Sequence, residues 1–473
     1  MKDVVVLIPG IGGSSLSKDG TEVWSFSAGA ALRGVLSRGG TIKKLALDGD
    51  DPDADDLGDG VKATRLLPDF HVVPGLDWRI DGYGRFAEQV VQRFDLVPGQ
   101  NYFELPYDWR RDNRVAARSL ARRAAGWLKE WRTSSGNADA KLVLIGHSMG
   151  GIVSRLFLES AYDELEPLGS GPEGWRYTST LITLGTPYSG SVNAVEFLVN
   201  GFKKGWGPFT VDLTDTIRSF TSVYQLLPSY RCLQGEGAAW LNLDEVDWTG
   251  SGLEQDRLVD AITVQRDLRA AVDARLGQGM AGYDVRPVIG DFQRTRWALA
   301  RSGTGASTSV RAMFARADGE DGGDGTVAKV SASPHELLDG FQQAAFMSQR
   351  HASLQNDDPV LDHIGGLLRR TPLDPVDVFP AGDTAVALEV EDVTTEEPLV
   401  VRARNAAGLP LAATLVPLAG GAPVPLVLTL AADGWHEASR DDLPEGDYRV
   451  TVGGAGTHPV TDVVSVVDVS TIG

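Results

Sequence analysis

Ser148 lies in a sequence pattern that converts a hydroxyl group into a nucleophile. The pattern, GHSMG at 146–150, follows the apolar run Leu142–Ile145 and precedes a stretch with helical periodicity. A G-x-S-x-G turn between a strand and a helix holds its serine strained and exposed at the helix N-terminus, where developing negative charge is stabilised. The flanking glycines let strand and helix approach closely. Ser148 is therefore the predicted nucleophile; the alternative is a glycine-rich turn with an incidental serine.

The serine hydroxyl needs a general base, and the base needs a carboxylate that orients it. Behind such a turn these partners follow in the chain order serine, acid, histidine. Of the seven histidines, this order removes residues 71 and 147, and their place in a separate C-terminal segment removes residues 436 and 458. His335 is predicted to lie at the start of a helix. The apolar residues at helical spacing around His363 predict a structural role for this histidine. His351, after AAFMSQR and before a polar stretch, is the predicted base.

The predicted acid is Asp324, in the glycine-rich stretch DGEDGGDGTV at 318–327. Asp321 is the second choice, and a surface turn is the alternative. The turn PGIGGS at 9–14 ends the first strand, and its glycines allow backbone N–H groups to approach a substrate oxygen. One such donor comes from this turn and another from the residue after the nucleophile. We predict the N–H groups of Gly12 and Met149; a phosphate-binding loop is the rival, but its G-x-G-x-x-G spacing is missing.

The elements that must hold these residues alternate along the chain between strand-like and helix-like stretches. The apolar runs are Val4–Ile8, Leu142–Ile145 and Leu181–Leu184, and the helical patterns are Tyr83–Phe94, Val115–Trp131 and Gly151–Ser160. Alternating strands and helices predict a parallel sheet, and continuously apolar runs indicate that both faces of it are covered. We expect this α/β domain to span 1–372.

An acidic stretch, DGDDPDADDLGDG at 48–60, resembles a calcium-binding loop at first sight. Counting from Asp51, however, position 6 is Asp56 rather than glycine and position 12 is Lys62 rather than glutamate. We therefore expect a solvated acidic loop. No metal and no cofactor are predicted anywhere in the chain, since the serine chemistry requires neither.

The composition changes near Thr371, where the proline-rich segment TPLDPVDVFPAGD reads as a linker. Short strand-like runs separated by glycine- and proline-rich turns follow, which predict a small all-β, immunoglobulin-like sandwich over 380–473. Residues 374–473 contain 16 Asp or Glu, four Arg and no Lys, so they carry −12 of the net charge of −20. This domain is expected either to stabilise the protein or to bind a protein partner.

The composition of the whole chain excludes several classes of protein. A net charge of −20 argues against nucleic acid as a partner. No apolar run reaches the 18 residues that a transmembrane helix needs. The first apolar run is too short for a signal peptide, and the single cysteine, Cys232, excludes an internal disulfide. A cytoplasmic protein is expected.

Six motifs in order over about 1–370 resemble the lecithin:cholesterol acyltransferase family, which includes the lysosomal phospholipase A and phospholipid:diacylglycerol acyltransferase branches. They are VVLIPGIGGSSL, LPYDWR at 105–110, LIGHSMGG, LITLGTPYSGS at 181–191, GDGTVA at 323–328 and QRHASL at 349–354. The resemblance implies an α/β-hydrolase fold with a cap and a lid. It likewise gives Ser148 as nucleophile, Asp324 as acid and His351 as base, and places His363 in the following helix.

The resemblance also implies substrate contacts outside these three residues. PYDWR corresponds to a cap-anchoring motif, so Trp109 is expected to line an acyl pocket or to hold the cap. The region 192–230 corresponds to the lid. Its aromatic residues Phe202, Trp206 and Phe209, beside two lysines, suit transient contact with a membrane surface or an ordinary apolar cover.

The predicted function is a serine lipid hydrolase or acyltransferase that cleaves acyl esters through an acyl-enzyme, as a phospholipase A does. The alternatives are a lipid:lipid O-acyltransferase, a carboxylesterase of non-lipid substrates, and a catalytically silent module that binds lipid or is regulated by a partner. The chain departs from the family's secreted members in having no disulfide and in its C-terminal domain, so extracellular lipoprotein chemistry is not expected.

Overall fold

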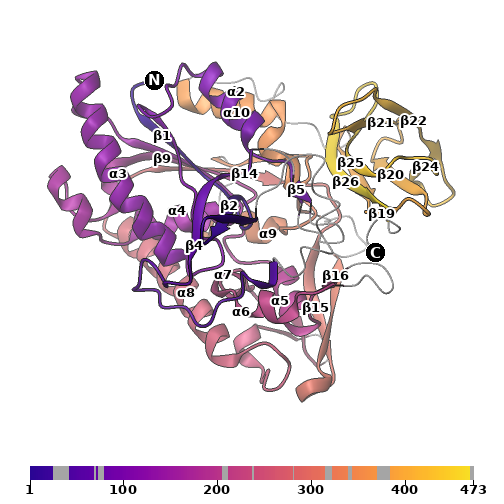
Figure 1. The fold of residues 1–473 in the computed structure, drawn as a ribbon, viewed down its shortest axis with the longest axis horizontal. Coiled ribbons are helices and arrows are strands. Elements are labelled where there is room, and N and C mark those ends of the chain that lie inside the picture. The colour runs from indigo at the N-terminus through magenta and orange to yellow at the C-terminus, as the bar shows by residue number, and fades with distance from the viewer. Residues whose placement is uncertain are drawn as a thin grey trace.

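The computed structural model of the chain describes residues 1–24, 42–68, 71–72, 79–204, 211–236, 239–280, 282–314, 322–338, 343–369 and 384–468. Its centre is a parallel sheet with the strand order β17-β14-β9-β8-β1-β7 (Figure 1). The strands are β1 (Val4–Ile8), β7 (Tyr102–Glu104), β8 (Leu142–His147), β9 (Thr178–Leu184), β14 (Asp284–Gly290) and β17 (Ala345–Met347).

Helices cover both faces of this sheet, as the continuously apolar strands predicted. Alternate residues of β1 point to opposite faces, and all five are buried. Val4, Val6 and Ile8 belong to the core shared with α3 (Asn113–Ser135) and α4 (Met149–Glu159). Val5 and Leu7 belong to the core on the other face, shared with α2 (Gly84–Arg93) and α10 (Asp358–Arg369), which lie above the sheet in Figure 1.

The strand order reverses between β1 and β8. The chain leaves β1 toward β7 on one side, whereas it leaves β8 toward β9 on the other. In open α/β sheets, ligands bind in the crevice that such a reversal opens at the carboxyl ends of the strands. The turn that begins at Pro9 and the serine at 148 follow directly on these two strands.

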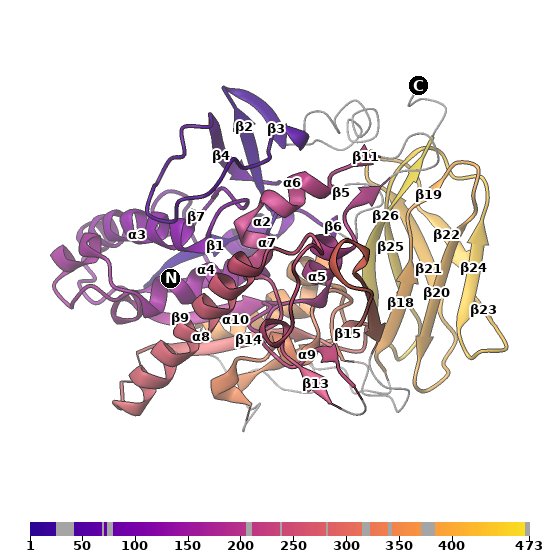
Figure 2. The same ribbon diagram turned by 90° about the horizontal axis from the view of Figure 1, so that it is seen from below.

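A cap region lies at the same edge of the sheet. Its helices α5 (Val192–Val199), α6 (Thr214–Ser219) and α7 (Thr221–Gln225) pack one after another, and α8 (Gln255–Gly277) packs against α7 (Figure 2). Two small sheets flank it, with the orders β13-β12-β15-β16 and β3-β2-β4. Their strands are β2 (Ser14–Lys18), β3 (Thr21–Trp24), β4 (Val61–Leu66), β12 (Leu233–Gln234), β13 (Trp240–Leu241), β15 (Arg296–Ser302) and β16 (Ser309–Phe314).

The shorter elements complete the α/β part. They are the strands β5 (His71–Val72), β6 (Arg79–Ile80), β10 (Lys203–Lys204) and β11 (Val211–Asp212), the helix α9 (Lys329–Ala332), and the 3-10 helices Asp163–Leu168, Gly174–Tyr177, Leu243–Glu245, Gly305–Ser307, His335–Leu337 and His351–Asn356. Within the described ranges, no helix combines the length and the apolar character needed to cross a bilayer.

The C-terminal part is a two-sheet sandwich. One sheet has the order β18-β20-β24-β23 and the other β19-β26-β25-β21-β22, and residues of both, such as Val401 and Val450, form one core. All pairs are antiparallel except β19 with β26. The strands are β18 (Val386–Val390), β19 (Val393–Thr394), β20 (Leu399–Asn405), β21 (Ala412–Pro417), β22 (Val424–Val427), β23 (Thr429–Leu430), β24 (His436–Arg440), β25 (Gly446–Gly453) and β26 (Val460–Val467).

These observations confirm the predicted fold class, an α/β-hydrolase-type sheet with a cap, followed by a small all-β sandwich. The domain limits at 372 and 380, and the linker between them, lie outside the described residues and stay predictions.

Candidate active site

The turn around Ser148 has the strained geometry expected of a nucleophile elbow. Ser148 has φ 52°, in the left-handed region that non-glycine residues rarely adopt. A Cβ atom added at Gly146 would lie 2.7 Å from the Cα of Gly151, and one added at Gly150 would lie 2.3 Å from the carbonyl oxygen of Ile8. The two glycines therefore have the steric role that the sequence predicted: strand, turn and helix approach too closely for any side chain there.

Ser148, His351 and Asp324 form a continuous chain of hydrogen bonds. Oγ of Ser148 lies 3.1 Å from Nε2 of His351, and Nδ1 of His351 lies 2.6 Å from Oδ2 of Asp324. The other carboxylate oxygen accepts the backbone N–H groups of Thr326, at 2.9 Å, and Val327, at 2.7 Å. Because Asp324 is only 1% exposed, these donors replace the water that would otherwise solvate it.

Three sheet strands deliver these side chains to one edge. Ser148 follows β8, and His351 begins a 3-10 helix just after β17. Asp324 belongs to the connection after β14, which first makes the excursion through β15 and β16 and then returns to the strand end. There Gln293 and Asp324 form an isolated parallel bridge. The backbone N–H of His351 donates to the carbonyl of Asp324 at 2.9 Å, so acid and base loops are also joined directly.

The rival histidines occupy other environments. Nε2 of His335 lies 2.8 Å from Oδ1 of Asp273 on α8. His363 lies on α10, where burial, helped by the charge of Arg286, lowers its pKa to about 4. A histidine held neutral in a packed helix agrees with the predicted structural role. Asp321, the second choice for the acid, lies outside the described residues.

A buried Tyr83–His147 pair supports the array, and sequence reasoning missed it. The Tyr83 hydroxyl accepts the N–H of Gly10 at 2.9 Å and lies 2.8 Å from Nδ1 of His147. The hydroxyl therefore donates its own proton to Nδ1, which leaves the ring proton on Nε2, 3.3 Å from the carbonyl oxygen of His351. Burial above all, then the neighbouring His351, lowers the pKa of His147 to about 3, so the ring stays neutral and positions the base loop. The two residues are 64 positions apart, and no motif or spacing in the sequence predicts that they form a pair.

The two predicted oxyanion donors differ in their placement. Met149 is the first residue of α4, so its N–H has no partner within the helix ladder. Gly12 has φ 73°, and its carbonyl accepts a hydrogen bond from Nε1 of Trp24 at 2.8 Å. The pocket beside Ser148 is lined by Gly10 and Ile11 but not by Gly12. The N–H of Gly12 as an oxyanion donor therefore stays a prediction, and Ile11 is its neighbour that borders the pocket.

An apolar pocket with a volume of about 80 Å³ opens beside Ser148 and His351. The cap helices α5, α6 and α7 supply much of its wall. The side chains from these helices and their ends are Asn193, Ala194, Phe197, Ile217, Val223 and Leu226. A pocket walled mainly by apolar side chains beside the serine suits a flexible acyl chain.

The predicted substrate and lid residues lie behind this wall or beyond the described residues. Phe202 is buried and packs edge-on against Phe197, with ring centroids 5.2 Å apart, so it supports the wall without forming it. Trp109 donates from Nε1 to the carbonyl of Ser14 at 3.0 Å and does not line the pocket. Its ring packs edge-on against Phe220, between α6 and α7 of the cap, with ring centroids 5.6 Å apart, so these contacts favour the second expected role, holding the cap. Trp206 and Phe209 lie outside the described residues, so membrane contact through them stays a prediction.

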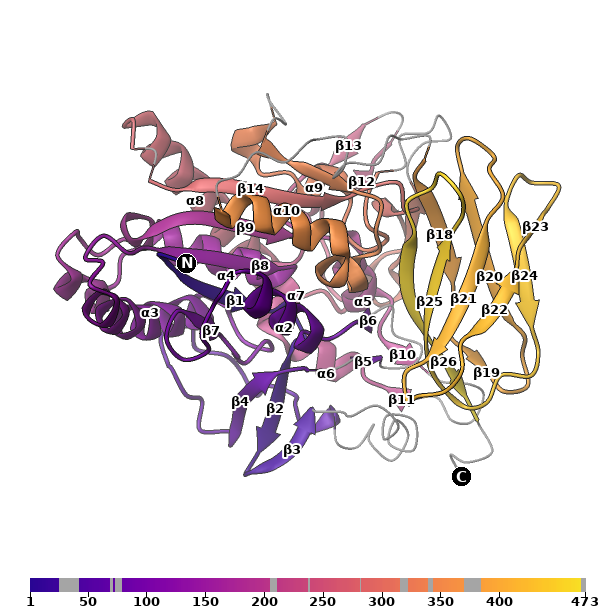
Figure 3. The same ribbon diagram turned by 90° about the horizontal axis from the view of Figure 1, so that it is seen from above.

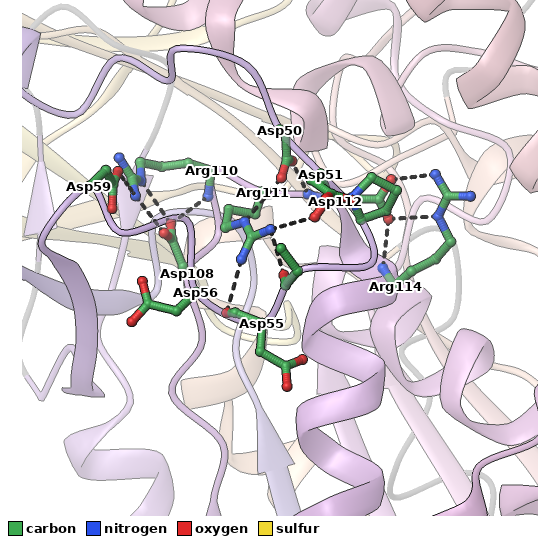
Figure 4. A network of polar contacts seen from close by, with 12 residues as sticks. Asp50, Asp51, Asp55, Asp56, Asp59, Asp108, Arg110, Arg111, Asp112 and Arg114 are labelled. Carbon is green, nitrogen blue, oxygen red and sulfur yellow. Dashed lines mark hydrogen bonds and ion pairs between the residues drawn. The ribbon is translucent and has the colours of Figure 1, made fainter.

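The acidic stretch 48–60 surrounds Arg110 and Arg111, the two residues after Trp109 (Figure 4). Arg110 is fully buried and pairs with Asp108, at 2.6 Å, and Asp59, at 2.9 Å. Arg111 pairs with Asp50 at 3.0 Å and donates to three carbonyls of the loop. The expectation of a solvated loop is therefore wrong for the carboxylate of Asp50, whose side chain is 5% exposed and ion-paired. Across the described residues, no cluster of three or more His, Cys, Asp or Glu could hold a metal ion.

Part of the chain matches a known protein family. Residues 76–274 match the family model described as lecithin:cholesterol acyltransferase. This stretch contains Ser148 and the helical cap, and it ends before Asp324 and His351. No curated protein gives a match to this chain.

Several solved structures are similar to the chain. A lipase of Bacillus licheniformis in its propeptide form is 14% identical, with 98% of this chain and 73% of that chain covered and a TM-score of 0.34. The mature form of the same lipase is 15% identical, with 78% of this chain and 92% of that chain covered and a TM-score of 0.33. A phospholipase of Legionella pneumophila in complex with thio-NAD is 9% identical, with 99% and 90% covered and a TM-score of 0.27. The family match confirms the resemblance that the motifs indicated: over 76–274 this chain has the sequence pattern of the lecithin:cholesterol acyltransferase family.

Proposed function

We propose that this protein is a serine hydrolase of lipid acyl esters, of the phospholipase A type, that works through an acyl-enzyme on Ser148. The observation that carries the proposal is the hydrogen-bond chain of 3.1 and 2.6 Å that ends at Ser148 beside an apolar pocket. The match of 76–274 to an acyltransferase family supports acyl esters as the substrate class.

In the first half-reaction, Oγ of Ser148 attacks the ester carbonyl carbon while Nε2 of His351 takes the hydroxyl proton. Asp324 stabilises the imidazolium that forms and fixes the ring so that Nε2 faces the serine. The tetrahedral intermediate then collapses. The bond to the alcohol oxygen breaks, His351 returns its proton to that oxygen, and the acyl group remains on Ser148.

In the second half-reaction, a hydroxyl compound attacks the acyl-enzyme with His351 again as base. Water gives a fatty acid, whereas a lipid alcohol gives a new ester. The family match favours neither outcome over the other, so acyl transfer to a lipid is the second candidate function. The two share every residue of the first half-reaction.

The negative charge of the intermediate needs donors on the side of Ser148 away from His351. We assign the N–H of Met149, at the start of α4, and the N–H of Ile11, because Ile11 borders the pocket where Gly12 does not. Removing one such donor typically costs about 10²–10³ in rate.

Hydrolysis of short-chain substrates tests the proposal. Wild type should release octanoate from dioctanoyl phosphatidylcholine or from p-nitrophenyl octanoate, and Ser148→Ala should not. Ser154→Ala is the matched control, since Ser154 is also buried, lies on the helix that follows Ser148, and donates its hydroxyl to the carbonyl of Gly150 at 2.7 Å. Equal activity of wild type and Ser148→Ala, or no hydrolysis by a wild-type protein that is folded, contradicts the proposal and favours a silent lipid-binding module.

A further inference from the structure

The C-terminal sandwich contacts the loop that carries the acid. Its strand β18 lies at the edge of a sheet, and an edge strand leaves a row of backbone N–H and C=O groups without a neighbouring strand. Two of these groups bond to Gln293, which donates from Nε2 to the carbonyl of Val386 at 2.9 Å and accepts the N–H of Leu388 at 3.1 Å. Gln293 also forms the parallel bridge with Asp324. The loop of the acid is therefore bonded directly to the sandwich.

The segment that leads to the base is bonded to the sandwich as well. Oγ of Ser348 donates to the carbonyl of Val386 at 3.1 Å and accepts the N–H of the same residue at 3.2 Å. Oε1 of Gln349 accepts the N–H of Thr461 on β26 at 2.8 Å. Ser348 and Gln349 are both buried, so the sandwich supplies hydrogen-bond partners that water supplies on an exposed loop.

Contacts with β26 lie on both sides of His351 in the chain. Nε of Arg350 donates to Oδ2 of Asp462 at 2.9 Å, and the side chain of Asp462 is only 2% exposed. Ala352, the residue after His351, packs with Val463 in a small apolar cluster. Figure 3 shows β18, β25 and β26 on the side of the sandwich that faces the α/β part. The chain is thus held against the sandwich immediately before and immediately after the base.

The base tolerates little movement. His351 must keep Nε2 at 3.1 Å from Oγ of Ser148 and, at the same time, Nδ1 at 2.6 Å from Oδ2 of Asp324. A misplacement of about 1 Å in such an array can lower the rate about 10²-fold. The last strand of the central sheet ends at Met347, and residues 348–350, which connect it to the base, carry the contacts with the sandwich. Catalytic groups on loops need a rigid support, and the sandwich lies where that support is required.

We infer that the C-terminal sandwich is a positioning element of the active site, which holds the loops of Asp324 and His351 in the geometry that activates Ser148. Strand β18 fixes both loops, and β26 fixes the base loop on each side of the histidine. The inference rests on the proposed function, because it gives the sandwich a part in the reaction at Ser148. This role is separate from the two that the sequence predicted for the domain, stabilising the protein and binding a protein partner.

Two substitutions in the full-length chain test this inference. Asp462→Asn keeps the shape of the side chain and weakens the ion pair with Arg350, whereas Gln293→Leu removes both hydrogen bonds to β18. We expect kcat for p-nitrophenyl octanoate to fall about 10- to 100-fold in each variant. KM should stay close to that of wild type, because neither residue lines the apolar pocket. The rate at which a fluorophosphonate labels Ser148 should fall together with kcat.

A milder variant keeps the test available where Gln293→Leu does not fold. Ser348→Ala removes only the hydroxyl that bonds to Val386, and it should lower kcat in the same way by a smaller factor. Circular dichroism and the melting temperature of each variant give its folded fraction, and kcat is expressed per folded molecule. A role in stability alone would change the melting temperature and leave this kcat and KM at their wild-type values.

Asp447→Asn is the matched control. Asp447 is also a buried carboxylate of the sandwich, but its Oδ1 accepts the hydroxyl of Ser465 within the sandwich, at 2.6 Å. Its kcat per folded molecule should equal that of wild type. Wild-type kcat in a folded Asp462→Asn or Gln293→Leu protein overturns the inference, and so does an equal loss of kcat in Asp447→Asn. If hydrolysis by wild type is Ser148-dependent in these cases, only this inference fails; if wild type hydrolyses no ester, the proposed function fails with it.

Discussion

Two buried networks of polar side chains in the α/β part differ in how they end. The guanidinium of Arg110 donates to Asp59, Asp108 and the carbonyl of Leu45, and that of Arg111 donates to Asp50 and to carbonyls of the same loop, so both are satisfied within the network (Figure 4). In the array of Asp324 and His351, the hydrogen bonds run in one direction and end at Ser148, which borders an apolar pocket. Burial of charge is common to both networks. A reactive group at an open end distinguishes the one that can perform chemistry.

The largest effect should come from the base at the open end. His351→Ala removes the proton acceptor, so kcat should fall about 10⁴–10⁶-fold while the protein stays folded. His363→Ala is the matched control, since it removes a histidine that packs in α10. It should lower the melting temperature and leave the activity per folded molecule near that of wild type. The reverse pattern, with activity lost only in His363→Ala, would show that the base is misassigned.

The acid should come second. Asp324→Asn keeps the shape of the side chain but removes the charge that stabilises the imidazolium, and an amide can favour the wrong ring tautomer. We expect a loss of about 10⁴ in kcat. Activity measured against pH, together with a circular dichroism spectrum matching wild type, separates this loss from misfolding. Wild-type activity in this variant would mean that another carboxylate orients His351.

Substitutions in the network around Arg110 and Arg111 should lower the free energy of unfolding and leave the rate of ester hydrolysis unchanged. Arg111→Met leaves the carboxylate of Asp50, which is 5% exposed, without its ion-pair partner, and breaking a buried ion pair costs about 3–5 kcal/mol. Arg122→Met, at a partly exposed arginine that pairs with Asp55, should cost less than about 1 kcal/mol. Denaturant unfolding measures both, and activity per folded molecule should be retained. If Arg111→Met abolished turnover in a stable protein, the conclusion that this network has no part in catalysis would be wrong.

The smallest expected effect is a pH dependence of stability. The pKa of His363 is lowered from 6.5 to about 4 in the folded protein, so the unfolded chain binds the proton more readily between these values. The free energy of unfolding should therefore fall as the pH drops from 6.5 to about 4, by up to ~3 kcal/mol. His363→Gln should show a shallower fall over this range in denaturant titrations. An identical slope in both proteins would assign the effect to other groups.

Short-range patterns predicted the local features of the site well. Apolar periodicity and glycine spacing predicted the elbow at Ser148. They also predicted the strands β1, β8 and β9 and the helices α2, α3 and α4. In the C-terminal part, apolar runs predicted strands at Ala385–Val390, Leu399–Arg404, Ala412–Pro417, Val424–Leu430 and Tyr448–Val452. The strands β19, β24 and β26 were not predicted, although β26 is buried along most of its length. The expected sandwich nonetheless followed from the remaining runs, because any few of its strands carry the same turn spacing.

The long-range grouping of Ser148, Asp324 and His351 followed from the chain order of the motifs and from the resemblance; other contacts distant in sequence could not be predicted. Tyr83 and His147 meet across the crevice, and Gln293 meets Val386 across the two parts of the chain; neither pairing leaves a mark on the residues nearby. The sequence around Trp109 does not distinguish a tryptophan that lines a pocket from one that supports its wall. Choosing between Gly12 and Ile11 requires the path of a tight turn, where a shift of one residue changes the direction in which an N–H points.

Covalent labelling tests the central claim most directly, that Ser148 is a nucleophile activated by His351. A fluorophosphonate added in slight excess to the folded protein should give one adduct by intact-mass spectrometry, located on the tryptic peptide that contains Ser148. Labelling should be absent in Ser148→Ala and strongly slowed in His351→Ala. Stoichiometric labelling of Ser148→Ala, or an adduct on a different serine of the wild-type protein, would contradict the account.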